Sequence, residues 1–376
     1  MIELAEVVRK HGPEYLEKFG DRMPNNHKRA LSAIASCRTE EMGGHLEECD
    51  HHCGHFDYAY HSCKNSSCPK CHGADTAKWL SKREAELLPV PYFHLVFTLP
   101  SELRDVVRKN QHALYGVLFE AAIAALSKLG LDRKYLGGRL GMVAVLHTWT
   151  RAKEYHPHLH ILVPGGALDK DGVWRPARKK FLVPVKALSP IFRAIFMRHA
   201  RKALPTETFP QEVWDKDWVV FSRPTFKKTK KVLTYLSRYV YRVAIANNSI
   251  IEMENDHVTF RYQNADTREW KTMRLMAMEF LRRVLQHVLP KGFHKVRYFG
   301  FLHPTNKVTL KRLQLLLWEM DRKRAAQPEQ NIAAGTEVVR VCPRCKEGIM
   351  VVISWLPKRA RSPPPTGGER KSWRQT

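Results

Sequence analysis

The sequence predicts an α+β protein with a small zinc-binding module at its N-terminus. Short apolar runs rich in β-branched and aromatic residues, such as 92–99 and 156–163, are typical of strands, and longer amphipathic runs between them are typical of helices. Six of the eight cysteines fall between residues 37 and 71. In a reducing compartment such a cluster more often holds a metal than disulfides, so it predicts zinc.

The elements can be placed in order along the chain. Residues 1–88 are expected to form a helical, zinc-stapled unit that ends in a helix over 73–88, and a buried strand at 92–99 precedes a long helical region that reaches residue 130. The remaining expected elements are strands at 141–150 and 156–163, basic helices at 189–204 and 227–245, a hairpin at 257–275, and helices at 276–289 and 309–325. The basic, proline-rich tail from Pro357 is expected to be disordered.

The charge balance indicates a polyanionic partner. Lys and Arg number 63 and Asp and Glu number 37, which gives a formal net charge of +26 with neutral histidines. This is far more than solubility requires, so nucleic acid is the first partner to expect. With 376 residues the chain can bury a substantial core in two or three structural units.

Neither a signal sequence nor a membrane span is expected. The opening residues MIELAEVVRKHG lack the basic, apolar and small-residue order of a secretory signal. The longest apolar run, Leu114 to Leu131, carries Glu120 and Lys128 and is expected to be a buried helix. These observations predict an intracellular protein.

The cysteine spacing predicts where zinc binds. Tetrahedral zinc takes four thiolate or imidazole ligands, and the pairs in CDHHC and CPKC can each supply two thiolates from a tight turn. We therefore predict one zinc site from Cys49, Cys53, Cys68 and Cys71. A second site could combine Cys37 and Cys63 with His45 and His72. The pair Cys342 and Cys345 in CPRC is only half a site, and we expect it to be a vestigial or loosely held knuckle.

Three histidines alternate along the strand expected at 156–163. Residues i and i+2 of a strand point to the same face, so His156, His158 and His160 share one side of it. A row of imidazoles is costly to bury without partners. This face therefore either meets water or binds a metal, and we interpret it as a candidate metal site.

A cationic helical segment follows later in the chain. Tyr235 and Tyr239 are four residues apart and share one helical face, whereas Tyr241 points elsewhere. The segment 222–250 contains no acid, and its candidate DNA-binding residues are Lys227, Lys228, Lys230, Lys231, Arg238 and Arg242. Cations near a tyrosine reduce the cost of ionising its hydroxyl, and a divalent ion would polarise the phosphate that the phenolate attacks. The chain has no phosphate-loop motif, so nucleotide hydrolysis is not expected.

Together these segments resemble the HUH (His-hydrophobic-His) single-strand endonucleases, and among them the rolling-circle transposases of the insertion-sequence-ninety-one family. The matching segments are CRTEEMGGH, YHSCKNSSCPKC with a following Trp79, HTW, HPHLHILVPGG, YLSRYVYRVAI and GFHKVRYFGFL. They occur in the family's order and cover about residues 25–305. The resemblance implies an antiparallel sheet with flanking helices, similar to an RNA-recognition fold.

The resemblance also implies residue roles. His158 and His160 would be the metal ligands, Tyr235 and Tyr239 would be the nucleophiles, and the third ligand would be His156 or a Gln or His from another element. Because CDHHC departs from the spacing of the family, His51 or His52 could replace Cys53 as a zinc ligand. The implied divisions are a zinc-binding DNA-recognition module at 1–88, an HUH nuclease domain at 89–274, a helical region at 275–340, and a CxxC knuckle with a basic tail at 341–376.

The implied function is that of a transposase that nicks and rejoins single-stranded DNA through a covalent 5′-phosphotyrosine intermediate. Magnesium or manganese would serve the catalytic site, and one or two zinc ions would serve the N-terminal module. The expected partners are single-stranded DNA, hairpins at the element ends and target DNA, and the expected location is the bacterial cytoplasm.

Two other functions remain open at this point. A plasmid or phage replication initiator uses the same chemistry, although the cysteine-rich module and GFHKVRYFGFL argue against it. A zinc-dependent DNA-binding protein without catalysis would use the histidines structurally. A cut-and-paste transposase with a carboxylate triad is disfavoured, because the strands at 141–150 and 156–163 carry no acid.

Overall fold

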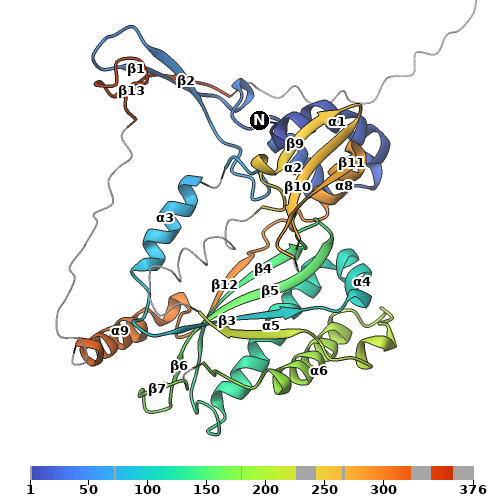
Figure 1. Cartoon of the computed structure of the whole chain (residues 1–376), viewed down its shortest axis with the longest axis vertical. Helices are drawn as coiled ribbons and strands as arrows, with labels where there is room; N and C mark the ends of the chain where they lie inside the picture. Colours follow the sequence, from blue (N-terminus) through green and yellow to red (C-terminus); the bar gives the residue numbers. More distant parts are fainter. Residues whose placement is uncertain are drawn as a thin grey trace, which may run out of the picture.

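A five-stranded antiparallel sheet forms the centre of the molecule (Figure 1). The computed structural model describes residues 2–71, 73–178, 180–225, 243–264, 267–322 and 340–358. The strand order is β12–β4–β5–β3–β8, and the strands are β3 (Tyr92–Thr98), β4 (Gly141–Trp149), β5 (Tyr155–Pro164), β8 (Val220–Pro224) and β12 (Val296–Gly300). The three strands predicted from apolar runs are β3, β4 and β5, so the predicted α+β class with an antiparallel sheet is confirmed.

One face of this sheet is covered by helices. These are α4 (Arg104–Lys109), α5 (Gln111–Leu131) and α6 (Val185–Ala203). Alternate residues of each central strand point into this core, among them Leu95, Ala144 and Ile161. The helix α5 is apolar on all sides, and its length and composition would suffice to cross a membrane, but most of its apolar window is buried in the protein. It is a core helix between the sheet and α6, as the sequence predicted.

The opposite face has an apolar part and a polar part. Tyr92, Val145 and Leu162 belong to the apolar part, which Trp79 of α3 (Gly73–Glu84) covers. The indole of Trp79 donates a hydrogen bond to the Tyr298 hydroxyl of β12 at 3.0 Å. The helix α9 (Lys307–Arg322) packs nearby, and β6 (Gly166–Leu168) pairs with β7 (Trp174–Pro176). The polar part of the face carries histidines.

The N-terminal helices share a second core with a segment from late in the chain. The helices are α1 (Leu4–Phe19) and α2 (Asn25–Ala35), and their partners are β9 (Ile250–Glu254), β10 (His257–Gln263), β11 (Trp270–Met276) and α8 (Ala277–Leu285). Figure 1 shows these elements together above the central sheet. Residues 245–288 thus share a core with the N-terminal helices, and each set covers the apolar face of the other. The divisions at residues 88 and 274 stay a prediction.

A third, smaller sheet joins the two ends of the chain. Its order is β13–β1–β2, with β1 (Gly44–Cys49), β2 (Phe56–Tyr60) and β13 (Met350–Leu356). The strand β13 pairs antiparallel with β1 from Gly44↔Leu356 to Cys49↔Met350. The sequence analysis did not anticipate this strand, and the residues of the predicted disordered tail from 359 onward lie outside the described part of the chain.

His287 joins the second core to the central sheet. It follows α8, is 5% exposed, and its Nε2–H donates to the Lys153 carbonyl at 3.2 Å. Its Nδ1 lies 3.2 Å from the Thr148 hydroxyl. Burial lowers the pKa of His287 to about 3, so the ring is neutral at neutral pH.

This buried histidine predicts a loss of stability in acid. In the unfolded chain the pKa of a histidine is about 6.5, so between pH 6.5 and 3 the unfolded state binds more protons at this site and stability falls as pH falls. At pH 5 His287 should lower the unfolding free energy by on the order of 1–2 kcal/mol relative to pH 7.5. Denaturant unfolding of His287→Gln at the two pH values should show a smaller pH dependence, while His294→Gln, at an exposed position, should behave as wild type. An identical pH dependence in His287→Gln would contradict the assignment.

Candidate active site and cysteine clusters

Three histidines from two neighbouring strands form a compact cluster on the sheet face opposite α5. His147 of β4 lies directly across from His158 of β5 in the strand register, and His160 follows on the same face. One ring nitrogen from each of the three lies within 4.8 Å of the others, and among the described residues no carboxylate joins this group. Three imidazoles at this spacing can hold a divalent ion and leave coordination positions open for oxygen ligands.

The backbone of β5 orients the His158 ring. The Nδ1–H of His158 donates to the His156 carbonyl at 2.7 Å, which leaves the lone pair on Nε2. This Nε2 lies 3.2 Å from the Nε2 of His160. Burial lowers the pKa of His158 to about 4, so the ring is neutral at pH 7. A neutral imidazole is the form that binds a metal.

His94 of β3 extends the cluster by one strand. Its Nε2 lies 2.9 Å from the Nδ1 of His160, and the two rings stack with centroids 5.1 Å apart. Burial, together with the nearby Arg223 and His158, lowers the pKa of His94 to about 4. In the tautomer in which His94 accepts this hydrogen bond, the proton of His160 is held on Nδ1 and its Nε2 carries the lone pair that a metal would take.

The structure corrects the place of His156. Its Nδ1 lies 3.3 Å from the Arg104 guanidinium, and it is outside the cluster. Residues on the same face of a strand follow one another about every 7 Å. In the row of three histidines, His156 and His160 are therefore about 13 Å apart along the strand and cannot share one ion. A residue directly across on the next strand is only about 5 Å away. The residue grouped with His158 and His160 is therefore His147, a histidine from another element, which was the alternative to His156.

Neither His147 nor His94 was assigned a role by the sequence analysis. His147 could have been found from the motif HTW, which lies in the strand before HPHLH. Two consecutive antiparallel strands can place their histidines opposite each other, as His147 and His158 are here. Its ring also stacks on Trp149 with centroids 4.8 Å apart. His94 lies in the apolar run YFHLVF, where a lone histidine carries little information without the register.

The predicted nucleophiles and DNA contacts lie outside the described residues. These are Tyr235 and Tyr239, and Lys227, Lys228, Lys230, Lys231, Arg238 and Arg242, all between 226 and 242. The described chain on either side is anchored to the sheet. Before the segment, Thr225 donates its backbone N–H to the Tyr92 carbonyl at 2.6 Å. After it, Val243 lines a small pocket with Thr148 and Trp149 at the end of β4, the strand that carries His147.

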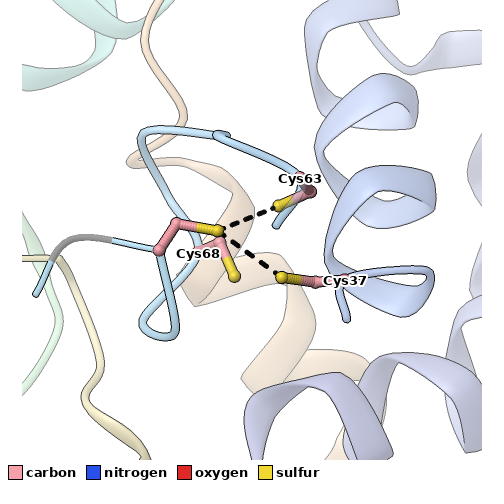
Figure 2. A group of neighbouring side chains, drawn as sticks. Cys37, Cys63 and Cys68 are labelled. Atoms are coloured by element: carbon pink, nitrogen blue, oxygen red, sulfur yellow. Dashed lines mark hydrogen bonds between the residues drawn. The ribbon is translucent and has the colours of Figure 1, made fainter. Parts of the chain in front are cut away.

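Four cysteines gather their sulfur atoms at the base of the β1–β2 arm. Figure 2 shows Cys37, which follows α2, together with Cys63 and Cys68 from the loop after β2, with their sulfur atoms directed toward one another. The fourth member, Cys71, has its Sγ 3.5 Å from the Sγ atoms of both Cys37 and Cys63. Thiolates at 2.3 Å around a tetrahedral zinc ion would be about 3.8 Å apart, so this group fits zinc. Hydrogen bonds, the largest with Cys68, lower the pKa of Cys63 to about 5.

The other four cysteines meet at the tip of the same arm. Cys49 and Cys53 lie beside Cys342 and Cys345, so the predicted site of Cys49, Cys53, Cys68 and Cys71 is not formed. The reason is the hairpin itself. Because Gly44 pairs with Tyr60, the chain segments that contain Cys37 and Cys63 lie together at the base of the arm. Cys49 lies five residues further along β1, about 17 Å from Gly44. Cys342 and Cys345, predicted to be half a site, complete the group at the tip.

Among the described residues, none of the histidines predicted as zinc ligands belongs to either cysteine group. The Nε2 of His45 lies 2.9 Å from a carboxylate oxygen of Glu47, and its ring meets the edge of Trp355. His51 and His52 are exposed near the arm tip and do not replace Cys53. His72 lies outside the described part of the chain.

Comparison with known proteins identifies two matching family models. Residues 7–99 match the model described as "Transposase zinc-binding domain", and residues 141–309 match the model described as "Putative transposase". The first range contains Cys37, Cys63, Cys68 and Cys71, and the second contains His147, His158 and His160.

Two relatives are similar over most of the chain. The "Putative transposase y4qJ" of Sinorhizobium fredii is 36% identical over 380 residues, which cover 93% of this chain and 94% of the relative. The "Transposase for insertion sequence element IS801" of Pseudomonas savastanoi pv. phaseolicola is 27% identical over 290 residues, 72% of this chain and 69% of the relative. No solved structure matches the chain.

The cysteine group at the arm base predicts a zinc-dependent fold of the N-terminal module. Cys68→Ser should remove one equivalent of zinc and lower the melting temperature, because a structural zinc site contributes folding free energy directly. Zinc analysis of the purified protein together with a thermal melt would measure both effects. Ser66→Ala, an exposed substitution in the same loop, should change neither. Unchanged zinc content in Cys68→Ser would show that this group is not a zinc site.

Proposed function

The chain belongs to the IS91 family of transposases, and we propose that it nicks and rejoins single-stranded DNA through a covalent 5′-phosphotyrosine intermediate. The observation that carries this proposal is the cluster of His147, His158 and His160 on adjacent central strands. The cluster supports metal-assisted phosphoryl transfer, because one ring nitrogen of each histidine lies within 4.8 Å of the others, close enough for the three to share one ion.

The donor set fits a divalent ion. The Nε2 atoms of His158 and His160 lie 3.2 Å apart, and the Nδ1 atom of each ring has its own partner, so a cation held by both Nε2 atoms would leave those outer hydrogen bonds intact. Imidazoles by themselves favour zinc, whereas phosphate and water in the open positions would suit magnesium or manganese. When bound, the ion would polarise a phosphate oxygen and stabilise the charge of the transition state. We propose magnesium or manganese for this site.

The residues around the cluster would position the ligands. His94 would hold His160 in the tautomer that presents Nε2, as outer partners of metal-binding histidines do. The backbone carbonyl of His156 does the same for His158. Arg104, beside His156 at the edge of the cluster, would offer a fixed positive charge to a DNA phosphate.

The covalent step would use a tyrosine of the segment between 226 and 242. The hydroxyl oxygen of Tyr235 or Tyr239 would attack the phosphorus, the bond from phosphorus to the 3′-oxygen would break, and that oxygen would leave with a proton. Ionising a tyrosine at pH 7 costs roughly 4 kcal/mol, which the six cations of this segment would reduce. The phosphotyrosine keeps the energy of the phosphodiester, so rejoining would require no nucleotide hydrolysis.

The anchored ends of this segment support the assignment. Val243 lines a small pocket with Thr148 and Trp149, so the described chain resumes after residue 242 at the end of β4, the strand that carries His147. The net charge of +26 suits single-stranded DNA, hairpins at the element ends and target DNA as partners. We propose that the protein acts on these in the bacterial cytoplasm.

Substitutions in the histidine cluster should abolish strand cleavage. In His147→Ala, His158→Ala and His160→Ala the yield of a denaturation-resistant protein–DNA adduct should fall more than about 100-fold, because loss of a ligand exceeds the 10–100-fold cost typical of its outer partners. The assay uses labelled single-stranded DNA from an element end with Mg²⁺ or Mn²⁺, and zinc content should stay unchanged.

His156→Ala provides the matched control on the same strand face. It should retain most of the adduct, because the His156 ring is outside the group of ligand nitrogens and the substitution keeps the backbone carbonyl that orients His158. Full activity of His147→Ala combined with loss in His156→Ala would reverse the assignment of the third ligand. Undiminished adduct in all three cluster variants would rule out the proposed chemistry.

Substitution of both tyrosines should eliminate the covalent intermediate. Tyr235→Phe and Tyr239→Phe should each block transposition, since a two-nucleophile reaction needs one tyrosine to keep the first strand while the other cleaves the second. The double variant should form no adduct, whereas Tyr241→Phe should remain active and lose at most a hydrogen bond of about 1 kcal/mol. Peptide mass spectrometry would locate the modified residue. A phosphotyrosyl nucleotide found only at Tyr241 would disprove the assignment.

A further inference from the structure

We propose that Cys49, Cys53, Cys342 and Cys345 bind a second zinc ion that holds the two ends of the chain together. The inference concerns the architecture of the N-terminal module and stands apart from the strand-transfer chemistry. Neither matching family model reaches Cys342 and Cys345, since these models cover 7–99 and 141–309. The site is therefore composed of one pair inside a known zinc-binding domain and one pair far outside it.

The sulfur atoms have the spacing of a tetrathiolate site. The Sγ of Cys49 lies 3.6 Å from that of Cys345, and the Sγ of Cys53 lies 3.7 Å from that of Cys342. All four atoms lie within 4.8 Å of one another. Thiolates around tetrahedral zinc would be about 3.8 Å apart, so each distance agrees with a shared ion. Cys49 and Cys342 are also almost completely buried, with 0% and 1% of their surface exposed.

The backbone around the later pair forms a tight turn directed at the sulfur atoms. The Gly348 N–H donates to the Sγ of Cys345 at 3.3 Å, and the Cys342 N–H donates to the Gly348 carbonyl at 2.7 Å. Lys346 adopts a positive φ of 61° to close the turn. A Cβ atom at Gly348 would lie 2.5 Å from the Sγ of Cys49, so only glycine lets the two pairs approach this closely.

The two turns are also joined by the strands that lead into them. The ladder of β1 and β13 ends at Cys49↔Met350, directly beside the cysteines. The Asp50 N–H donates to the Ile349 carbonyl at 2.9 Å, and the Arg340 guanidinium forms ion pairs with Glu47 of β1 and Asp57 of β2. These contacts bring the later pair to the arm tip in the orientation that a shared ion requires.

The ion would close the chain into a loop. The central sheet, residues 92–300, and the late part of the second core, residues 245–288, lie in sequence between the two cysteine pairs. A crosslink across so long a loop stabilises the folded state by restricting the unfolded chain, and it would keep β13 on the N-terminal arm. Without it, β13 would be held by the strand ladder and a few surface ion pairs, which contribute little each.

Zinc content tests the proposal on the full chain. The wild-type protein should contain two zinc ions, and the double variant Cys342→Ser/Cys345→Ser should contain one. Ser354→Ala on β13 should retain two, and adding Cys68→Ser to the double variant should leave none. Thiol titration of the denatured wild-type protein without reductant should find eight free thiols. A wild-type content of one zinc ion, a double variant that keeps two, or four thiols lost to disulfides would each overturn the proposal.

A cleavage experiment tests whether the ion joins the two ends. A protease recognition sequence inserted between Pro328 and Glu329 allows the full-length folded protein to be cut between β13 and the rest of the chain. After cleavage the C-terminal fragment should co-elute with the large fragment in gel filtration, and it should separate when zinc is removed by a chelator. The same fragment should separate without chelator in Cys342→Ser/Cys345→Ser. Continued co-elution in both cases would show that zinc does not join the ends.

Discussion

The antiparallel pairing of β4 with β5 is the constraint on which the candidate active site depends. In this register His147 stands opposite His158, while the alternation along β5 puts His160 on the same face. The other face of both strands is occupied by Ala144, Leu159 and Ile161, which are completely buried under α5 and α6. A slip of one residue would exchange the two faces and place imidazoles in the apolar core, so the burial of that core determines where the histidines point.

The histidine cluster is held at a cost that the fold has to offset. His94 is buried and His158 is partly buried, and burial lowers the pKa of each to about 4, so they stay neutral over the physiological range. Each of the two rings has a hydrogen-bond partner. The Nε2 of His94 pairs with the Nδ1 of His160, and the Nδ1–H of His158 donates to the His156 carbonyl. Neutral, oriented imidazoles are the state in which a cation binds with the least rearrangement.

The two cysteine groups show how one hairpin separates residues that are close in sequence. The β1–β2 arm has one group at its base and one at its tip, and the tip group is completed only when β13 arrives from the other end of the chain. The second core follows the same principle, because α1 and α2 cover their apolar faces with β10 and α8 from late in the sequence. The N-terminal module is thus assembled from early and late segments of the chain, and it lies above the central sheet in Figure 1.

The sequence by itself determined the class of the protein, its central strands and its family. The apolar runs that became β3, β4 and β5, the long apolar helix α5 and the hairpin of β10 and β11 all follow from local periodicity, which depends only on nearby residues. The order of the cysteine, HTW and HPHLH motifs was enough to suggest the family that the comparisons then showed. Which residues come together at each site depends on the tertiary fold. His147 rather than His156 lies with His158 and His160, because residues across two strands are closer than the outer members of a row along one strand. Cys342 and Cys345 lie with Cys49 and Cys53 because β13 pairs with β1, and this pairing cannot be deduced from the spacing of the cysteines.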